Sequence, residues 1–515
     1  MKISKKAVCF VLAAAAAVCV SGCGKKTENS SGDGNSLTYW VAFNGAATLG
    51  VENFAELPPM QELMKRTGAD IKFIHPTAGM EAEQFNVMIA GGDYPDIIES
   101  NFAGYQGGPE QAIKDGVIIS LNDLIEKSSP NFKKYMEEHP DFAKMAKSDN
   151  GTYYEYPAIY GDDYLQVYQG IILRKDILDK LGIEKPETVD EWTAMLKSFK
   201  DNGIETPLTI TQNDAYAFIQ AYGVTKGLYV DDGKIKYGHI EPGYKKGIQM
   251  LADWYKAGYI DKNFASADSQ SIKTAMLNGS SAAAFGMTGG AIGGWLGAME
   301  NKDDTYDLTA AKYPVVNKGE TPFYGQRVNP IVTSTGAAIT TACKNTELAA
   351  KVLDYAYSDD GVLLFNFGIE GVSYNMVDGY PTYTELVTKD AQGRSMGDMI
   401  AYYARPNGIG ASIRDKRYME QFAARPQQKE SIEIWSQTKA KEHLMPPVLL
   451  SEEENAKVNA IKSDLDSYVS SEELKFITGV RSMDEFDSYV DTIKGMGVDK
   501  YIEAYQAAYD RYIRR

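Results

Sequence analysis

Residues 81–100, EAEQFNVMIAGGDYPDIIES, set the pattern of the fold. Residues 81–90 are expected to form a helix, which Gly92 and its neighbour end because glycine readily adopts a left-handed conformation. A turn with Pro95 follows, and residues 96–100 are expected to form a strand. The same alternation precedes this unit, with strands expected at 37–43 and 70–74 and a helix at 58–67. Strands that alternate with helices of this length predict an α/β fold with a largely parallel sheet.

Residues 188–295 contain the start of a helix, a hairpin turn and a glycine-rich segment. Thr188 and Glu191 have the spacing of a capping box, in which the two residues satisfy each other's backbone donors. Residues 230–235 predict a hairpin, because Asp-Gly favours positive φ in its turn. A strand at 282–287 runs into TGGAIGGW at 288–295, where so many glycines near a tryptophan predict either close approach of the backbone to a ligand or a helix N-terminus that faces a cleft.

Several of these segments, in this order, resemble the extracellular solute-binding proteins of the maltose-binding-protein-like class. Residues 92–98 (GDYPDII) resemble the family's GDxPDI segment, and residues 151–157 (GTYYEYP) resemble the strand before its first crossover. Residues 368–379 (GIEGVSYNMVDG) are similar to a lipoprotein branch related to alginate-binding lipoproteins. Residues 476–512 are similar to that branch's C-terminal helices. The resemblance implies a two-lobed periplasmic-binding-protein fold (class II-like): two α/β lobes joined by hinge crossovers, with a helical C-terminus.

The resemblance also implies a division of the chain. The expected parts are a lipoprotein signal peptide at 1–22, a flexible tether at 23–36, an N-terminal lobe of 37–158 with 311–400, and a C-terminal lobe of 159–310 with 401–515.

The N-terminus has the layout of an export signal. Lysines precede an uncharged apolar run that is too short to span a bilayer, and Val20–Ser21–Gly22–Cys23 follows it. That order resembles a lipobox, in which Cys23 becomes the acylated first residue of the mature chain. The alternative is an ordinary signal peptide with an incidental cysteine. A lipobox implies an extracellular protein anchored to the cell membrane by lipid alone, and the branch favours a Gram-positive surface.

Composition limits the possible partners. The net charge is −17, and cleavage before Cys23 removes three lysines and no acid, which leaves −20. Such a chain repels nucleic acid and anionic lipid, and a polyanionic ligand would need a local basic pocket. Cys343 is the only cysteine of the mature body after Cys23, so no disulfide is expected within the body and Cys343 is expected to be buried.

The sequence carries no recognisable catalytic motif. Its four histidines are not in a metal-binding spacing, and it has no G-x-S-x-G, P-loop or G-x-G-x-x-G. The alginate-binding relatives have a calcium loop where residues 201–204 (DNGI) lie here, which offers too few oxygen ligands for that cation. We therefore expect no enzyme activity, no cofactor and no bound metal.

The resemblance implies that ligand binds between the lobes, at loops after strand ends. The expected ligand is an oligosaccharide, because aromatic rings stack on pyranose faces, and the expected partners are the permease subunits of an ABC importer. A monomer is expected. The candidate residues are Asn44, Ser100, Asn101, Phe102, Tyr105, Tyr160, Tyr164, Asn213, Asp214, Tyr216, Gly289, Gly290, Trp295 and Arg327.

Three alternatives stay open. Trp295, Tyr105 and Tyr216 have core packing as an alternative role. The same fold could hold a peptide or another small solute. A membrane-tethered glycosidase needs only two separated carboxylates, which spacing alone does not reveal.

Overall fold

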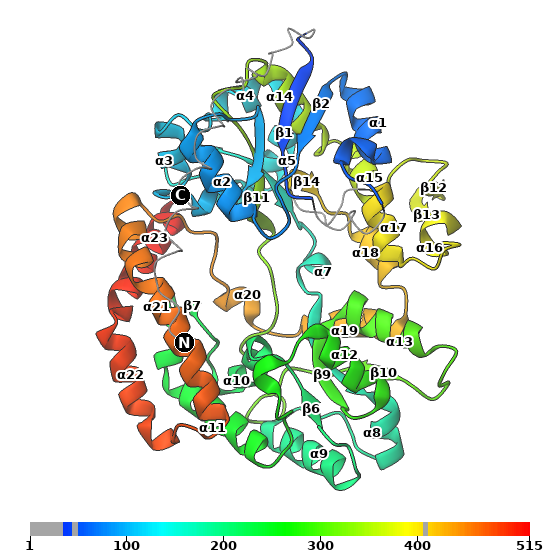
Figure 1. Ribbon diagram of the computed structural model, residues 1–515, viewed down its shortest axis with the longest axis vertical. Helices are drawn as coiled ribbons and strands as arrows, with labels where there is room; N and C mark the ends of the chain where they lie inside the picture. Colours follow the sequence, from blue (N-terminus) through cyan, green and yellow to red (C-terminus); the bar gives the residue numbers. More distant parts are fainter. Residues whose placement is uncertain (1–33, 44–49, 405–409) are drawn as a thin grey trace, which may run out of the picture.

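The computed structural model describes residues 34–43, 50–404 and 410–515. Two lobes, each with a central sheet and surrounding helices, lie one above the other in Figure 1. The expected two-lobed α/β architecture with a helical C-terminus is therefore confirmed. The signal segment, Cys23, most of the tether and Asn44 lie outside the described residues.

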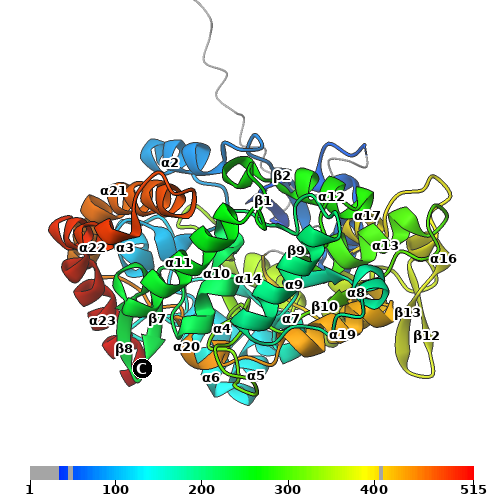
Figure 2. The same ribbon diagram turned by 90° about the horizontal axis from the view of Figure 1, so that it is seen from below.

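The first lobe is built on a six-stranded sheet in the order β14-β4-β11-β3-β1-β2. Its strands are β1 (Ser36–Trp40), β2 (Asp70–Ile74), β3 (Ile97–Ser100), β4 (Tyr156–Ile159), β11 (Ile331–Ile339) and β14 (Ser412–Ile413). Its helices are α1 (Pro58–Thr67), α2 (Glu81–Gly91), α3 (Gly108–Lys114), α4 (Asn122–Ser128), α5 (Pro130–Glu138), α6 (Pro140–Ala146), α14 (Thr346–Tyr355), α15 (Asp359–Phe367), α16 (Glu385–Thr388) and α17 (Met396–Tyr403). A hairpin of β12 (Tyr374–Val377) and β13 (Tyr380–Tyr383) projects from its side (Figure 2).

Strand direction in this sheet is mixed. Strands β1, β2 and β3 are parallel, and the register Tyr39↔Phe73 places two aromatic rings on one buried face. Strand β11 is antiparallel to both of its neighbours, β3 and β4. The expectation of a largely parallel sheet is confirmed here, because β14 is parallel to β4 and, of the six described strands, β11 alone runs against the others. Strand β11 is reversed because the chain re-enters the lobe from the second lobe through it.

The second lobe has a four-stranded sheet in the order β10-β5-β9-β6 and a separate hairpin. Its strands are β5 (Gln169–Arg174), β6 (Leu208–Thr209), β7 (Leu228–Asp231), β8 (Lys234–Tyr237), β9 (Ala283–Met287) and β10 (Leu308–Ala310). Its helices are α8 (Lys175–Leu181), α9 (Val189–Asp201), α10 (Tyr216–Ile219), α11 (Pro242–Lys256), α12 (Ser269–Asn278), the π-helix η8 (Thr288–Gly293), α13 (Gly294–Met299), α19 (Pro426–Trp435) and α20 (Ala440–His443).

Local sequence accounts for these elements. The predicted capping box starts α9: Thr188 Oγ1 accepts a hydrogen bond from the Glu191 N–H (3.2 Å), and the Glu191 carboxylate accepts one from the Thr188 N–H (3.1 Å). The predicted hairpin is β7–β8, with positive φ at Asp232 and Gly233 in its turn. Trp192, on the inner face of α9, is fully buried.

The lobe boundaries expected at 311 and 401 both come too early. Tyr313 is buried in the core of the second lobe, so the chain leaves that lobe only shortly before β11. Strand β14, at Ser412–Ile413, still pairs with β4 in the first lobe. The segments that connect the lobes are residues 160–168 with α7 (Asp163–Gln166), residues 326–330, and residues 414–425 with α18 (Lys416–Phe422).

The C-terminal helices run along one side of both lobes (Figure 1). They are α21 (Glu452–Ile477), α22 (Phe486–Gly495) and α23 (Val498–Arg514). Helices α21 and α23 pack against α11 and β8 of the second lobe. The end of α23 reaches the first lobe, where the Asp149 carboxylate accepts hydrogen bonds from Nε of Arg511 and Nε of Arg515, both 2.8 Å. None of the described helices is both long and apolar enough to cross a membrane.

Candidate functional site

The edge of the first-lobe sheet that faces the crossovers is formed by the end of β3 and the beginning of β11. Ser100, the last residue of β3, pairs with Gly336. Residues 331–335 of β11 therefore extend past the end of β3, with only β4 beside them. This arrangement leaves polar side chains at the position where ligand-facing loops are expected.

A bulge in β11 supplies those polar side chains. Val332 pairs with Ala158 and Ala337 with Tyr156, so the residues 333–336 lie opposite the single residue Pro157. Proline has no N–H to give to a ladder, which favours a bulge at this point. Thr333, Ser334 and Thr335 were not among the residues predicted from the sequence, because a bulge depends on the pairing of two distant strands.

Beneath the bulge lies a buried carboxyl group. Glu155 is 1% exposed, and neither of its carboxylate oxygens has a hydrogen-bond partner among the described residues. Burial raises the pKa of Glu155 well above its usual value. A Cβ at Gly336 would collide with this carboxyl group, so the glycine provides its space.

The predicted residues after β3 divide into two groups. Ser100 and the exposed Asn101 lie at the sheet edge, and Asn101 Oδ1 caps a short helix by accepting from the Gly104 N–H (3.0 Å). Phe102 is 0% exposed and packs edge-on against Phe85, so its prediction as a ligand contact is wrong: the chain turns inward here to fill the core. Tyr105 is half-buried, and its hydroxyl donates to Asp115 (2.9 Å), which ties it to its own lobe.

In the second lobe, the loop after β6 presents Asn213, Asp214 and Tyr216. Asn213 is exposed. The Asp214 carboxylate accepts from the backbone N–H (2.9 Å) and hydroxyl (2.7 Å) of Thr211, and burial raises its pKa although these hydrogen bonds oppose the shift. Asp214 therefore shapes the loop. Half-buried Tyr216 packs edge-on against Phe285 and Tyr324, which forms an aromatic surface.

The glycine-rich segment at residues 288–295 packs mainly against other parts of the protein, and little of it is free to contact a ligand. A Cβ at Gly289 would collide with the Phe422 ring of α18, so this glycine allows the third crossover to lie against η8. Trp295 is 4% exposed within the core of the lobe, because α13 turns the indole inward, and this burial favours its alternative role in core packing. Gly290 is exposed, and a Cβ there would meet no atom within 4 Å.

The hinge contributes a cation and aromatic rings. Tyr160 and Tyr164 are half-buried in the first crossover. The Arg414 guanidinium, in the third crossover, lies 5.0 Å from the ring centre of Tyr418 and 6.0 Å from that of Tyr160. Arg414 Nε is buried without a hydrogen-bond partner among the described residues. No sequence pattern predicted Arg414, because only the pairing of strand β14 with β4 places it beside the first crossover.

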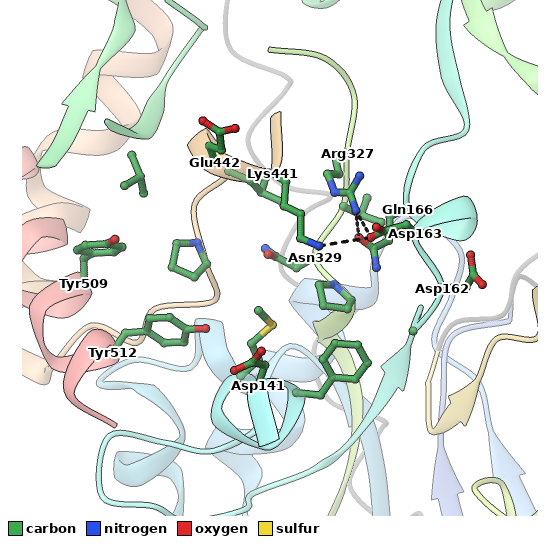
Figure 3. Close-up of a pocket in the computed structure, with 18 of the residues that line it drawn as sticks. Asp141, Asp162, Asp163, Gln166, Arg327, Asn329, Lys441, Glu442, Tyr509 and Tyr512 are labelled. Carbon is green, nitrogen blue, oxygen red and sulfur yellow. Dashed lines mark hydrogen bonds and ion pairs between the residues drawn. The ribbon is translucent and has the colours of Figure 1, made fainter. Parts of the chain in front are cut away.

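The second crossover carries Arg327, which binds the first crossover. Its Nη2 donates to the Asp163 carboxylate and to Gln166 Oε1 (2.7 Å). Lys441 Nζ lies 3.7 Å from the same carboxylate. Figure 3 shows these side chains at one end of a cavity of about 690 Å³. Arg327 is the only predicted ligand residue that lines this cavity within the described part of the chain.

The chemistry of these groups suits recognition. Both lobes and the hinge present tyrosines together with hydroxyl, amide and guanidinium groups, which can stack on a ring and hydrogen-bond its substituents. Among the described residues, no group of three or more His, Cys, Asp or Glu side chains lies close enough together to hold a metal ion. The absence of bound metal and of catalysis stays a prediction.

The sequence and the fold of this chain are similar to those of known solute-binding proteins. The family model described as bacterial extracellular solute-binding protein matches residues 52–362. The fructooligosaccharide ABC transporter substrate-binding protein FusA of Streptococcus pneumoniae is 24% identical, over 98% of this chain and 97% of its own. The alginate-binding protein AlgQ2 without calcium ion has a TM-score of 0.74 at 23% identity, over 92% of this chain and 98% of its own. An HMO-binding, ABC-transporter-associated solute-binding protein of Bifidobacterium longum infantis has a TM-score of 0.75 at 20% identity, over 93% and 99%.

Proposed function

Because this chain belongs to the family of bacterial extracellular solute-binding proteins, we propose that it captures an oligosaccharide between its lobes and delivers it to an ABC importer. The observation that carries the proposal is that the second lobe presents the aromatic surface of Tyr216 and Tyr324, while the first lobe presents the polar bulge of β11. A ligand that contacts both surfaces stabilises the closed arrangement, because only then are both sets of contacts made.

The relatives support a carbohydrate as the class of ligand. One binds a fructooligosaccharide, one alginate, and one HMO, as their names state. The net charge of −17 opposes an acidic polymer, so we propose a neutral oligosaccharide. The proposed contacts are Ser100, Asn101, Thr333, Thr335, Tyr160, Tyr164, Asn213, Tyr216, Gly290, Tyr324 and Arg414.

The protein is proposed to work as a monomer on the outer face of the cell membrane. Its anchor is the lipid on Cys23, after removal of the signal peptide at 1–22, and its partner is the permease of the importer. The branch related to alginate-binding lipoproteins favours a Gram-positive cell. The protein itself is proposed to catalyse no reaction.

A thermal-shift screen of the mature chain tests the ligand class. A bound ligand raises the free energy of unfolding by RT ln(1 + [L]/Kd), so neutral oligosaccharides should raise the melting temperature. Acidic oligosaccharides and peptides should not. A shift with peptides alone would contradict the proposal, and release of shortened saccharide would indicate a glycosidase instead.

Two variants locate the site. Tyr216→Ala should abolish the shift with the neutral oligosaccharide. Tyr255→Ala is the matched control, because Tyr255 lies on α11 of the same lobe, with its hydroxyl on the Lys262 carbonyl (3.3 Å). Equal shifts in both variants would remove Tyr216 from the site.

A further inference from the structure

The cavity of Figure 3 lies at the hinge, beside the end of α23. Its walls come from α6, the first two crossovers, residues 441–446 and the end of α23. Ser100, Tyr216 and Arg414, from the two lobes and the hinge, do not line it. Its volume of about 690 Å³ lies within the range of small-molecule sites, roughly 300–1,000 Å³.

One end of this hinge cavity has hydrogen-bonding groups that the protein does not use. The Arg327 side chain is 9% exposed, and its Nη2 is bound to Asp163 and Gln166. Its Nε and Nη1 have no partner among the described residues. Asn329 donates through Nδ2 to the Met445 carbonyl (2.9 Å), which leaves its Oδ1 as an acceptor. An occupant with both donors and acceptors would satisfy these groups.

The other end of the hinge cavity is aromatic. Tyr509 and Tyr512 of α23 line it. Aromatic rings opposite convergent polar groups are the combination that binds the apolar face and the hydroxyl groups of a sugar.

The charges of the lining exclude strongly charged occupants. Its carboxylates are Asp141, Asp162, Asp163 and Glu442, and its cations are Arg327 and Lys441. The excess of carboxylates repels an anion. A cation would lie beside the unused donors of Arg327, which it cannot satisfy. A neutral molecule with hydroxyl groups meets neither penalty.

We infer that the hinge cavity is a second binding site, for a neutral mono- or disaccharide. Its walls belong to both lobes and to the segments that connect them, so the affinity of its occupant depends on the angle between the lobes. By linkage, the occupant then changes the affinity of the interlobe site by the same factor. This inference does not depend on which ligand the interlobe site takes.

Thiol protection tests the site. The mature chain with Cys23→Ala retains only Cys343, which is buried, so an introduced thiol dominates the reaction with a water-soluble reagent. Ile513→Cys places the thiol at the cavity, at a position 51% exposed, and Val480→Cys places it at an exposed position that does not line the cavity. The probes are millimolar sucrose, glucosamine and glucuronate.

Sucrose should slow the reaction of the thiol introduced by Ile513→Cys about threefold at a concentration of twice Kd, because the free fraction is 1/(1 + [L]/Kd). It should leave the Val480→Cys protein unchanged. Adding Tyr509→Ala should abolish the protection, whereas Tyr505→Ala, one turn earlier on the same helix, should preserve it.

Three results would overturn the inference. The first is no protection by sucrose. The second is protection by glucosamine or glucuronate instead, which would mean a charged ligand. The third is protection that survives Tyr509→Ala, which would mean that sucrose acts by closing the lobes from the interlobe site.

Discussion

The carboxyl group of Glu155 makes the stability of the protein depend on pH. Burial raises its pKa well above 4.5, so the folded chain keeps a proton that the unfolded chain loses above that pH. Its contribution to the free energy of unfolding is therefore complete below pH 4.5. It is lost as the pH rises from there toward the folded-state pKa.

Glu155→Gln should remove this dependence, because glutamine does not ionise. Over the window above pH 4.5, the free energy of unfolding of the variant minus that of the parent should grow by about 1.4 kcal/mol per pH unit. Urea unfolding at several pH values between 4 and 8 measures it. A difference that stays constant over this range would contradict the prediction.

Trp295 should matter for stability rather than for ligand contact. The indole is 4% exposed in the second-lobe core, and truncation of a buried tryptophan to alanine destabilises by about 3–5 kcal/mol. Urea unfolding of ligand-free Trp295→Ala measures this loss. If the variant were as stable as the parent but failed to bind oligosaccharide, Trp295 would be a ligand platform after all.

Single residues were the least predictable scale. A tryptophan after a glycine-rich turn suits either a binding surface or a core, and only the direction of α13 decides between them. Phe102 was misplaced for the same reason. Arg414 and the bulge residues Thr333–Thr335 were missed because their positions depend on the pairing of strands far apart in sequence.

At the scale of elements, the docking of α18 on η8 depends on one glycine. A Cβ at Gly289 would collide with Phe422, whereas a Cβ at Gly290 would meet nothing within 4 Å. Gly289→Ala should therefore destabilise the protein by about 1–3 kcal/mol, the usual cost of overpacking, and Gly290→Ala should not.

Thermal unfolding of the two glycine variants, side by side, measures this difference. Neither Gly289 nor Gly290 has a positive φ, so alanine at either position adds no backbone strain to the difference in stability. Equal melting temperatures would show that the Phe422 ring moves aside at no cost.

Elements themselves were largely predictable, because their signals are local. Helix α1 occupies the predicted residues 58–67, and the capping box at Thr188 begins α9 as expected. The motif at 92–98 correctly indicated the family. The direction of a strand has no local sequence signal. Strand β11 is antiparallel to β3 because the chain returns from the other lobe, and no residue within β11 indicates this.

At the scale of the whole molecule, the two lobes are tied together in more places than the sequence indicated. The crossovers were expected, but the contact of α23 with the first lobe through Asp149 was not. The boundaries at 311 and 401 failed because the segments after them stay with the lobe they come from, held by Tyr313 and by strand β14.

The lipid anchor should affect where the protein works and not how tightly it binds. Both lobes and all connecting segments lie beyond residue 34, whereas Cys23 lies in front of the folded body. Cys23→Ala should therefore leave the affinity for the oligosaccharide unchanged in solution. In cells, the same variant should appear in the medium or the soluble fraction, and uptake of the oligosaccharide should fall because tethering raises the local concentration of the loaded protein near its permease.

Titration of the purified Cys23→Ala protein measures its affinity, fractionation of cells measures its location, and transport of labelled oligosaccharide measures its delivery. Tyr216→Ala, which should stay on the membrane and lose binding, is the complementary control. A Cys23→Ala protein that stayed on the membrane would show an ordinary signal peptide with an incidental cysteine, and one that lost affinity in solution would show that the N-terminal segment takes part in binding.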